Sequence, residues 1–349
     1  MRIIIALLIF SGIILFHEFG HFLLSRLNGV FVIEFSLGMG PRLLSHVSRK
    51  SGTRYSLKIL PFGGSCAMRG EDDGDMSEGA FGRAKVWQRL LIVAAGPFFN
   101  FLLAFLGAVI IVTGAGYDAP YAEYLSEGYP AQEAGMERGD LITAVGGEKI
   151  TVYRDFSGYI SLHQKDFAAG KPVTVSWIHD GESKSAELTA RQSESGRYIL
   201  GITGGARIPA KNPAQVLRYS LYEVKYWIST TLNSLRLLLT GRISVQNVSG
   251  PVGVVQMIGD TYEETKSEGG FYLFLNMINL VILLSANLGV MNLLPFPALD
   301  GGRIVLLLLE AVRGKKLGEN IEGYINLAGF AVLMVLMVLI LINDTRKIL

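Results

Sequence analysis

Four long runs of apolar residues set the pattern of hydrophobic and polar positions along this chain. A helix of about 20 apolar residues crosses the roughly 30 Å hydrocarbon core of a bilayer. The runs are Ile3–Leu24, Leu90–Thr113, Tyr272–Leu299 and Ile325–Ile342. No small-residue cleavage site follows the first run, so it is predicted to be a retained helix and not a secretory signal. The pattern therefore predicts a polytopic α-helical membrane protein with four transmembrane helices.

Shorter patterns between these runs predict strands. Between the first two runs, Tyr55, Leu57 and Ile59 alternate with polar neighbours, as expected of a half-buried strand. Between the second and third runs lies an extramembrane region, Gly114–Gly270. It contains a predicted Gly-Gly turn in GDLITAVGGEKI and a hairpin around the Asp-Gly pair of PVTVSWIHDGESKSAELTA. The strand-rich part, Tyr117–Gly205, is predicted to be a small α/β or β-sandwich domain.

A helix with one apolar face is predicted after this domain. Residues spaced by threes and fours place seven apolar side chains on one side of it. They are Leu217, Leu221, Val224, Ile228, Leu232, Leu235 and Leu239. Charged residues in the same stretch, such as Arg218 and Arg236, make a membrane span unfavourable. The helix is predicted to lie at the membrane surface, with packing against the domain as the alternative.

Composition supports a membrane protein and excludes other classes. Half of the 349 residues are hydrophobic, 18% are charged and the mean hydropathy is +0.37, which is too apolar for an ordinary soluble domain. The net charge of +2 gives no sign of a nucleic-acid binder. Cys66 is the only cysteine, which excludes an internal disulfide framework and a zinc site built from cysteines.

The distribution of basic residues predicts the orientation in the membrane. Ser25–Arg89 contains ten Lys or Arg residues, and Arg313, Lys315 and Lys316 follow the third run. Cytoplasmic loops are enriched in these residues, so both termini and the 114–270 region are predicted to be extracytoplasmic. Basic residues near the termini weigh against this orientation. The acidic stretch Glu71–Gly79 is interpreted as a solvated linker, with a metal-binding or gating loop as the alternative.

Three polar, titratable side chains interrupt the first apolar run, in the sequence HEFGH. An ionisable group at the bilayer centre costs roughly 2.5–3.5 kcal/mol, so a compensating interaction is expected. On a helix, His17 and His21 lie on one face, one turn apart and within reach of a single zinc ion. Glu18 is offset from them, toward a water molecule at the metal. This is the H-E-x-x-H pattern of zinc metalloproteases. The alternative is hydrogen bonding of these side chains within a helix bundle.

A catalytic zinc ion with three protein ligands needs one residue more than HEFGH supplies. The third apolar run ends in NLLPFPALDGG, where Asp300 is the only acidic residue between Phe271 and Leu309. Pro295 and Pro297 break the helix just before it and allow the backbone to turn inward. Asp300 is therefore predicted to be the third ligand. The alternative is an Asp-Gly turn that ends the span.

With these motifs the sequence resembles the site-2 protease family of intramembrane zinc metalloproteases (peptidase family M50), and within it the bacterial regulator of sigma-E protease branch. HEFGH is similar to the family's H-E-x-x-H, and NLLPFPALDGG to its N-x-x-P-x-P-x-L-D-G signature. AGPFFNF and SGPVGVVQMIG resemble the second-span segment and the stretch before the third span. YPAQEAGMERGDLITAVGGEKI resembles the opening of the branch's PDZ domains. The resemblance covers nearly the whole chain.

The resemblance implies a site and a domain organisation. It implies that His17, His21 and Asp300 bind Zn²⁺. Glu18 is the implied general base, and Asn292 is the implied contact to the substrate. The chain has room for one PDZ-like domain, whereas the best-known enterobacterial members carry two. The implied parts are residues 1–113 with two transmembrane helices and a membrane-associated β-sheet at about 32–69, the PDZ-like domain at 114–210, the amphipathic helical segment at 211–270, and the last two transmembrane helices at 271–349.

The implied activity is hydrolysis of peptide bonds within transmembrane segments of single-pass membrane proteins, such as anti-sigma factors or signal-peptide remnants. Such substrates are expected to be cut first by another protease. The enzyme is expected in the bacterial cytoplasmic membrane, with its active site near the cytoplasmic side. The PDZ-like domain is expected either to bind a new C-terminus or to exclude intact ectodomains. The intact Glu18 and Asp300 disfavour an inactive scaffold, and the missing inverted repeat disfavours a proton-relay transporter.

Overall fold

The protein is described by a computed structural model that covers residues 2–71, 75–241, 249–315 and 319–348. The chain divides into two compact units. Met1–Gly107 and Trp227–Leu349 form the membrane unit, and Ala108–Tyr226 form the insert unit. The predictions for Glu71–Gly79 and for the 211–270 segment fall partly on residues outside the described ranges.

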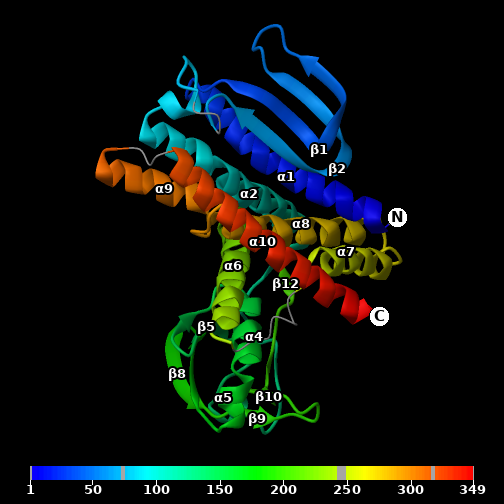
Figure 1. Cartoon of the computed structure of the whole chain (residues 1–349). Coiled ribbons are helices and arrows are strands. Elements are labelled where there is room, and N and C mark those ends of the chain that lie inside the picture. Colours follow the sequence, from blue (N-terminus) through cyan, green and yellow to red (C-terminus); the bar gives the residue numbers. More distant parts are fainter. Residues whose placement is uncertain (1, 72–74, 242–248, 316–318, 349) are drawn as a thin grey trace. The chain divides into compact units, whose positions relative to one another are not determined.

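Long apolar helices dominate the membrane unit (Figure 1). Among the described residues, four helices are long and apolar enough to cross a membrane, which confirms the predicted number of spans. The chain is therefore a polytopic helical membrane protein. The four helices are α1 (Arg2–Leu27), α2 (Val86–Ala115), α8 (Gly270–Leu293) and α10 (Glu319–Ile348), and the shorter helices of the unit are η1 (Phe81–Arg83), α7 (Pro251–Thr265) and α9 (Asp300–Arg313).

The third span is shorter than the sequence predicted. The prediction placed its end at Leu299, whereas α8 ends at Leu293. A proline disfavours helical backbone in the residue before it. Leu294 precedes Pro295 and is extended, with φ −60° and ψ 140°. The chain turns over residues 294–299 and starts α9 at Asp300, so the proline pair separates the membrane helix from the acidic residue.

Strands β1 (Val32–Val47) and β2 (Arg54–Met68) form a sheet in which each strand bends and contributes two segments. Residues 34–37 of β1 are in register with 64–67 of β2 on one side and with 54–57 on the other. One segment of β2 therefore lies at an edge, and in the described part of the chain no further strand pairs with it. Across the sheet the order is 42–47, 54–60, 32–39 and 64–68, and the last of these is named the edge segment.

The two faces of this sheet differ. On the face toward α1, Phe35 and Tyr55 pack on Phe22, with ring centroids 5.0 Å and 6.1 Å from the Phe22 ring. On the other face the buried Glu34 accepts a hydrogen bond from Arg42 at 2.6 Å, and this pairing lowers the pKa of Glu34 to about 2. One end of the sheet is apolar and exposed, which suits a membrane-associated position. Its exposed side chains are Met39, Leu43, Leu44, Ile59 and Leu60.

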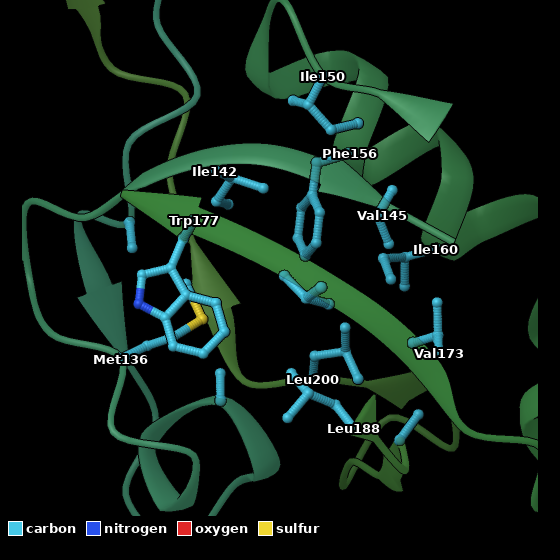
Figure 2. Close-up of a cluster of buried hydrophobic side chains, with 14 of the residues drawn as sticks. Met136, Ile142, Val145, Ile150, Phe156, Ile160, Val173, Trp177, Leu188 and Leu200 are labelled. Carbon is cyan, nitrogen blue, oxygen red and sulfur yellow. The ribbon is translucent and has the colours of Figure 1, made fainter. Parts of the chain in front are cut away.

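The insert unit contains a four-stranded antiparallel sheet in the order β6-β5-β7-β8. The two predicted turns are confirmed: the Gly-Gly pair 146–147 connects β5 to β6, and the Asp-Gly pair 180–181 connects β7 to β8, all four with positive φ. Figure 2 shows the core, where Phe156 of α4 and Trp177 of β7 lie among aliphatic side chains. The elements of the unit are β3 (Tyr117–Asp118), β4 (Tyr124–Leu125), α3 (Pro130–Glu133), β5 (Leu141–Val145), β6 (Glu148–Lys149), α4 (Tyr153–Leu162), α5 (Gln164–Ala168), β7 (Val173–His179), β8 (Glu182–Leu188), β9 (Arg191–Gln192), β10 (Tyr198–Ile199), β11 (Ile202–Thr203) and β12 (Arg207–Ile208).

The first half of helix α6 (Pro213–Leu239) belongs to the insert unit and packs on its other elements. Tyr219 stacks on Tyr117, with ring centroids 3.5 Å apart. Arg154 forms ion pairs with Asp118 and with Glu223 of α6, and both carboxylates are buried. This half of α6 therefore takes the packing alternative of the sequence prediction.

Candidate metal centre

Helix α1 places His17 and His21 on one face, as their four-residue spacing predicts. Their Nε2 atoms lie 3.2 Å apart, and the two rings meet at an interplanar angle of 85°. Both side chains are buried. His21 Nδ1 lies 2.8 Å from the carbonyl oxygen of Ile92, to which it donates, so the lone pair of this ring is on Nε2. Both rings therefore direct Nε2 to the same point.

A tight turn brings Asp300 to this point. Asp300 is the first residue of α9, and Ala298 before it has a left-handed φ of 70°. A Cβ on Gly301 or Gly302 would lie within 2.3 Å of a backbone carbonyl oxygen in the 294–299 turn. Only glycine at both positions allows α9 to start this close to the turn.

The three donor atoms have the spacing of a tetrahedral zinc site. Asp300 Oδ2 lies 3.2 Å from His17 Nε2 and 3.6 Å from His21 Nε2. Ligand atoms about 2.0–2.1 Å from a tetrahedral ion are separated by roughly 3.3–3.4 Å. Asp300 Oδ2 is buried and makes no hydrogen bond of normal geometry within the described part of the chain, so a cation would compensate it. Two imidazoles and one carboxylate are a ligand set typical of catalytic zinc.

Helix α2 closes the back of the site, which was not predicted from the sequence. A Cβ on Gly96 would lie 2.3 Å from His21 Nε2 and 2.6 Å from His17 Cε1, so glycine is needed for the helix to pass the imidazoles. Asn100 of the same helix is fully buried, and its Nδ2 lies 3.1 Å from His17 Nδ1. Two clues were available in the sequence: Asn100 is the only amide side chain in the run Leu90–Thr113, and it lies in the AGPFFNF segment that resembles the family's second span.

A buried ion pair anchors α9 to α2. Arg89 donates to both carboxylate oxygens of Glu310, at 3.0 Å and 2.5 Å. The two side chains are only 7% and 13% exposed, so the bidentate pair is weakly solvated and its geometry is well defined. Because α9 begins at Asp300, this pair helps to hold the third donor in place.

A cavity of about 530 Å³ adjoins the three donors. Glu18 lines it, and the Glu18 carboxylate accepts a hydrogen bond from the backbone N–H of Cys66 in the edge segment. Glu71 and Arg303 also line the cavity and form an ion pair. The Glu71 carboxylate accepts a hydrogen bond from the backbone N–H of Met68 at 3.3 Å. The site therefore borders the sheet edge, where two carboxylates accept hydrogen bonds from backbone N–H groups.

The structure brings together all five residues that were predicted for the site. His17, His21 and Asp300 supply the converging donors, and Glu18 lines the adjacent cavity. Asn292, near the end of α8, has its Nδ2 3.4 Å from His17 Nε2. The roles of these residues in binding and catalysis stay predictions.

Two imidazoles on a helix that can span a membrane converge with the Asp300 carboxylate at the start of the shorter helix α9, and the Glu18 carboxylate lies beside them. This arrangement defines the site of a membrane-embedded metallohydrolase. Residues 5–336 match the model of Peptidase family M50, and the chain belongs to this family, that of the site-2 proteases. The predicted family, the zinc dependence and the membrane location are thereby confirmed: the protein is a zinc metalloprotease of a bacterial membrane.

Relatives match along nearly their whole length. A homologue from Clostridium acetobutylicum is 35% identical over 344 residues, which are 98% of this chain and 97% of that protein. Zinc metalloprotease RasP from Geobacillus kaustophilus is 27% identical over 426 residues, covering 99% of this chain and 98% of the relative. Regulator of sigma-W protease RasP from Bacillus subtilis is 26% identical over 430 residues, again covering 99% and 98%. Among solved structures, the PDZ domain of the SdrC-like protein from Listeria monocytogenes is similar to 25% of this chain and 88% of its own, with 25% identity and a TM-score of 0.22.

Proposed function

We propose that this zinc metalloprotease is an endopeptidase that hydrolyses peptide bonds within the transmembrane segments of single-pass membrane proteins. Anti-sigma factors and signal-peptide remnants, cut first by another protease, are the proposed substrates. The proposal rests on the convergence of His17 and His21, on a helix that can span a membrane, with Asp300 at the start of α9. A hydrolytic site among such helices is accessible to a substrate that stays in the bilayer.

The proposed chemistry is divided between zinc and Glu18. Zinc bound by the three donors supplies a Lewis acid that polarises the scissile carbonyl and makes water more acidic. The Glu18 carboxylate accepts the proton of the attacking water and returns it to the leaving amine. Glu18 lines the cavity next to the donors but is not one of the converging ligands, which suits a base rather than a ligand.

Asn292 is proposed to hold the substrate. Its amide contacts His17 Nε2, the nitrogen that faces the other two donors. When that nitrogen binds the metal, the amide of Asn292 is free to donate to a carbonyl oxygen of the substrate. A peptide is thereby held next to the metal.

The substrate is proposed to bind as an added strand. The amides of a transmembrane helix are bonded to one another, so the helix must unwind locally before a peptide bond can be attacked. The edge segment presents the N–H of Cys66 next to Glu18 and the N–H of Met68 next to Glu71. An extended peptide can pair with such an edge. The added strand would take over these N–H groups from the two carboxylates and release Glu18 for catalysis.

Cys66 can report how the substrate lies, because it is the only cysteine and lines the cavity. In a Glu18→Gln variant, oxidative cross-linking of Cys66 to single cysteines at successive substrate positions is expected to peak at every second residue, since side chains alternate along a strand. Burial raises the pKa of the Cys66 thiol, so copper phenanthroline at alkaline pH is the suitable oxidant. A maximum at every third or fourth residue would contradict strand addition. Cys66→Ser is the control for cross-links formed elsewhere.

The proposed orientation places the termini and the insert unit outside the cytoplasm and the active site near the cytoplasmic side. The ten Lys and Arg residues of Ser25–Arg89 support it. A cysteine introduced at the exposed Asp180, in a Cys66→Ser background, should react with a membrane-impermeant thiol reagent in cells whose cytoplasmic membrane is intact. Labelling only after lysis would show that the orientation is the opposite of the proposed one.

Removal of zinc tests the proposed activity. The purified protein in lipid vesicles is expected to cut a tagged single-pass substrate within its transmembrane segment. A chelator should abolish the cleavage, and added zinc should restore it. Cleavage that persists without zinc, or that falls only outside the transmembrane segment, would reject the proposal. An inactive scaffold would bind the substrate and leave it intact.

A further inference from the structure

Asn100 is a buried polar side chain behind the metal centre that the proposed chemistry does not use. It is 0% exposed, and its Nδ2 lies 3.1 Å from His17 Nδ1. Its Oδ1 is buried and has no hydrogen-bond partner among the described residues. Burying a carboxamide whose oxygen accepts no hydrogen bond costs free energy, so Asn100 is expected to contribute something other than packing.

The side of the His17 ring that Asn100 touches is the side away from the donors. His17 Nε2 faces Asp300 Oδ2 and His21 Nε2, at 3.2 Å each. A metal at Nε2 requires the ring proton to be on Nδ1, and this N–H then needs an acceptor. Half a turn of the Asn100 carboxamide exchanges its two terminal atoms and places Oδ1 where it accepts from His17 Nδ1.

The two histidines are supported in different ways. His21 Nδ1 donates to the backbone carbonyl of Ile92 on α2. His17 Nδ1 instead contacts the side chain of Asn100, which is also on α2. A carboxamide can donate to a bare Nδ1 or accept from a protonated one, so Asn100 can serve His17 both without and with a metal. The helix itself is fixed at this point, because Ser285 of α8 donates to the backbone oxygen of Asn100 at 2.8 Å.

We propose that Asn100 is a positioning residue that sets the His17 ring and its metal-binding tautomer, a role that rests on the proposed zinc ligands. It touches neither the substrate nor the metal. It acts through the Nδ1–H···Oδ1 hydrogen bond, which favours the tautomer with a free Nε2 lone pair. Loss of such an outer hydrogen bond typically weakens metal binding by about 10–100-fold.

Zinc affinity of the full-length protein in detergent tests this role without reference to cleavage. Competition with a chromogenic chelator is expected to show about 10–100-fold weaker binding for Asn100→Leu, which has a similar volume and no acceptor. Asn100→Asp keeps an acceptor oxygen and is expected to bind zinc nearly as tightly as the wild type. A packing role predicts the opposite order, because leucine suits an apolar interior and an unpaired buried carboxylate does not. Asn276→Leu makes the same replacement on α8, where the carboxamide donates to the backbone oxygen of Tyr272 and does not line the cavity at the metal centre. It is the matched control and should leave the affinity unchanged.

A second readout follows the tautomer directly. The chain has five histidines, so a zinc-loaded sample with ¹⁵N-labelled histidine gives few signals. A protonated Nδ1 and a metal-bound Nε2 are expected for His17 in the wild type and in Asn100→Asp. Equal zinc affinity of Asn100→Leu and wild type would overturn the role of Asn100 and leave the zinc ligands standing. Absence of zinc from the wild type, or a His17→Ala variant that binds as tightly, would overturn the proposed function and this inference together.

Discussion

Replacement of Glu18 by glutamine is expected to lower the rate of substrate cleavage by about 10²–10⁴-fold, the range that a positioned general base contributes. Glutamine has nearly the same shape and keeps an oxygen that can accept from the Cys66 N–H. It cannot take a proton from water. Because Glu18 is not among the converging donors, the variant should retain zinc at the wild-type ratio. Cleavage of a tagged single-pass substrate in vesicles and zinc analysis of the same samples provide the two measurements.

The combination of the two measurements is decisive. Glu78 lies in the loop after β2 and is exposed, so Glu78→Gln removes a carboxylate from the same region without changing the cavity and should cleave normally. A Glu18→Gln protein that cleaves at the wild-type rate would remove Glu18 as the base. Loss of zinc together with activity would mean that Glu18 supports the metal, and the assignment of roles within HEFGH would have to change.

Replacement of Asp300 by alanine is expected to weaken zinc binding and to abolish cleavage. The loss of affinity should exceed the factor of about 10–100 that is typical when only a hydrogen-bond partner of a ligand is removed. The substitution removes the one carboxylate donor and leaves the two imidazoles, whose Nε2 atoms lie 3.2 Å apart. Equilibrium dialysis or chelator competition measures the affinity. Thermal unfolding with and without zinc should show that the variant loses the stabilisation that bound metal gives the wild type.

A matched control separates this effect from a general loss of charge. Asp180 is 96% exposed at the β7–β8 turn of the insert unit, where its φ is 47°. Asparagine tolerates this conformation, so Asp180→Asn should change neither zinc binding nor cleavage. Wild-type zinc affinity in Asp300→Ala would show that the third ligand lies elsewhere, although His17 and His21 remained the metal site.

The sequence by itself determined the features that depend on short spacings. The four-residue spacing of His17 and His21 suffices to place both rings on one face of a helix, and runs of about 20 apolar residues suffice to predict the spans. The Asp-Gly pair at 180–181 determines a tight turn wherever two strands flank it. Asp300 was predicted because HEFGH supplies two ligands, a catalytic zinc needs a third, and Asp300 is the only acidic residue between Phe271 and Leu309. These are local properties, so they could be recognised without a fold.

Only the tertiary structure decided what lies around these residues. It placed Asn100 against His17 across 83 residues of sequence and Glu310 against Arg89 across 221. It also made 64–68 the sheet edge beside Glu18, because both strands fold over in a register that alternation does not encode. Hydropathy shows which residues avoid water. The partner of a buried polar group depends on how distant helices pack, and that packing is set by the whole chain at once.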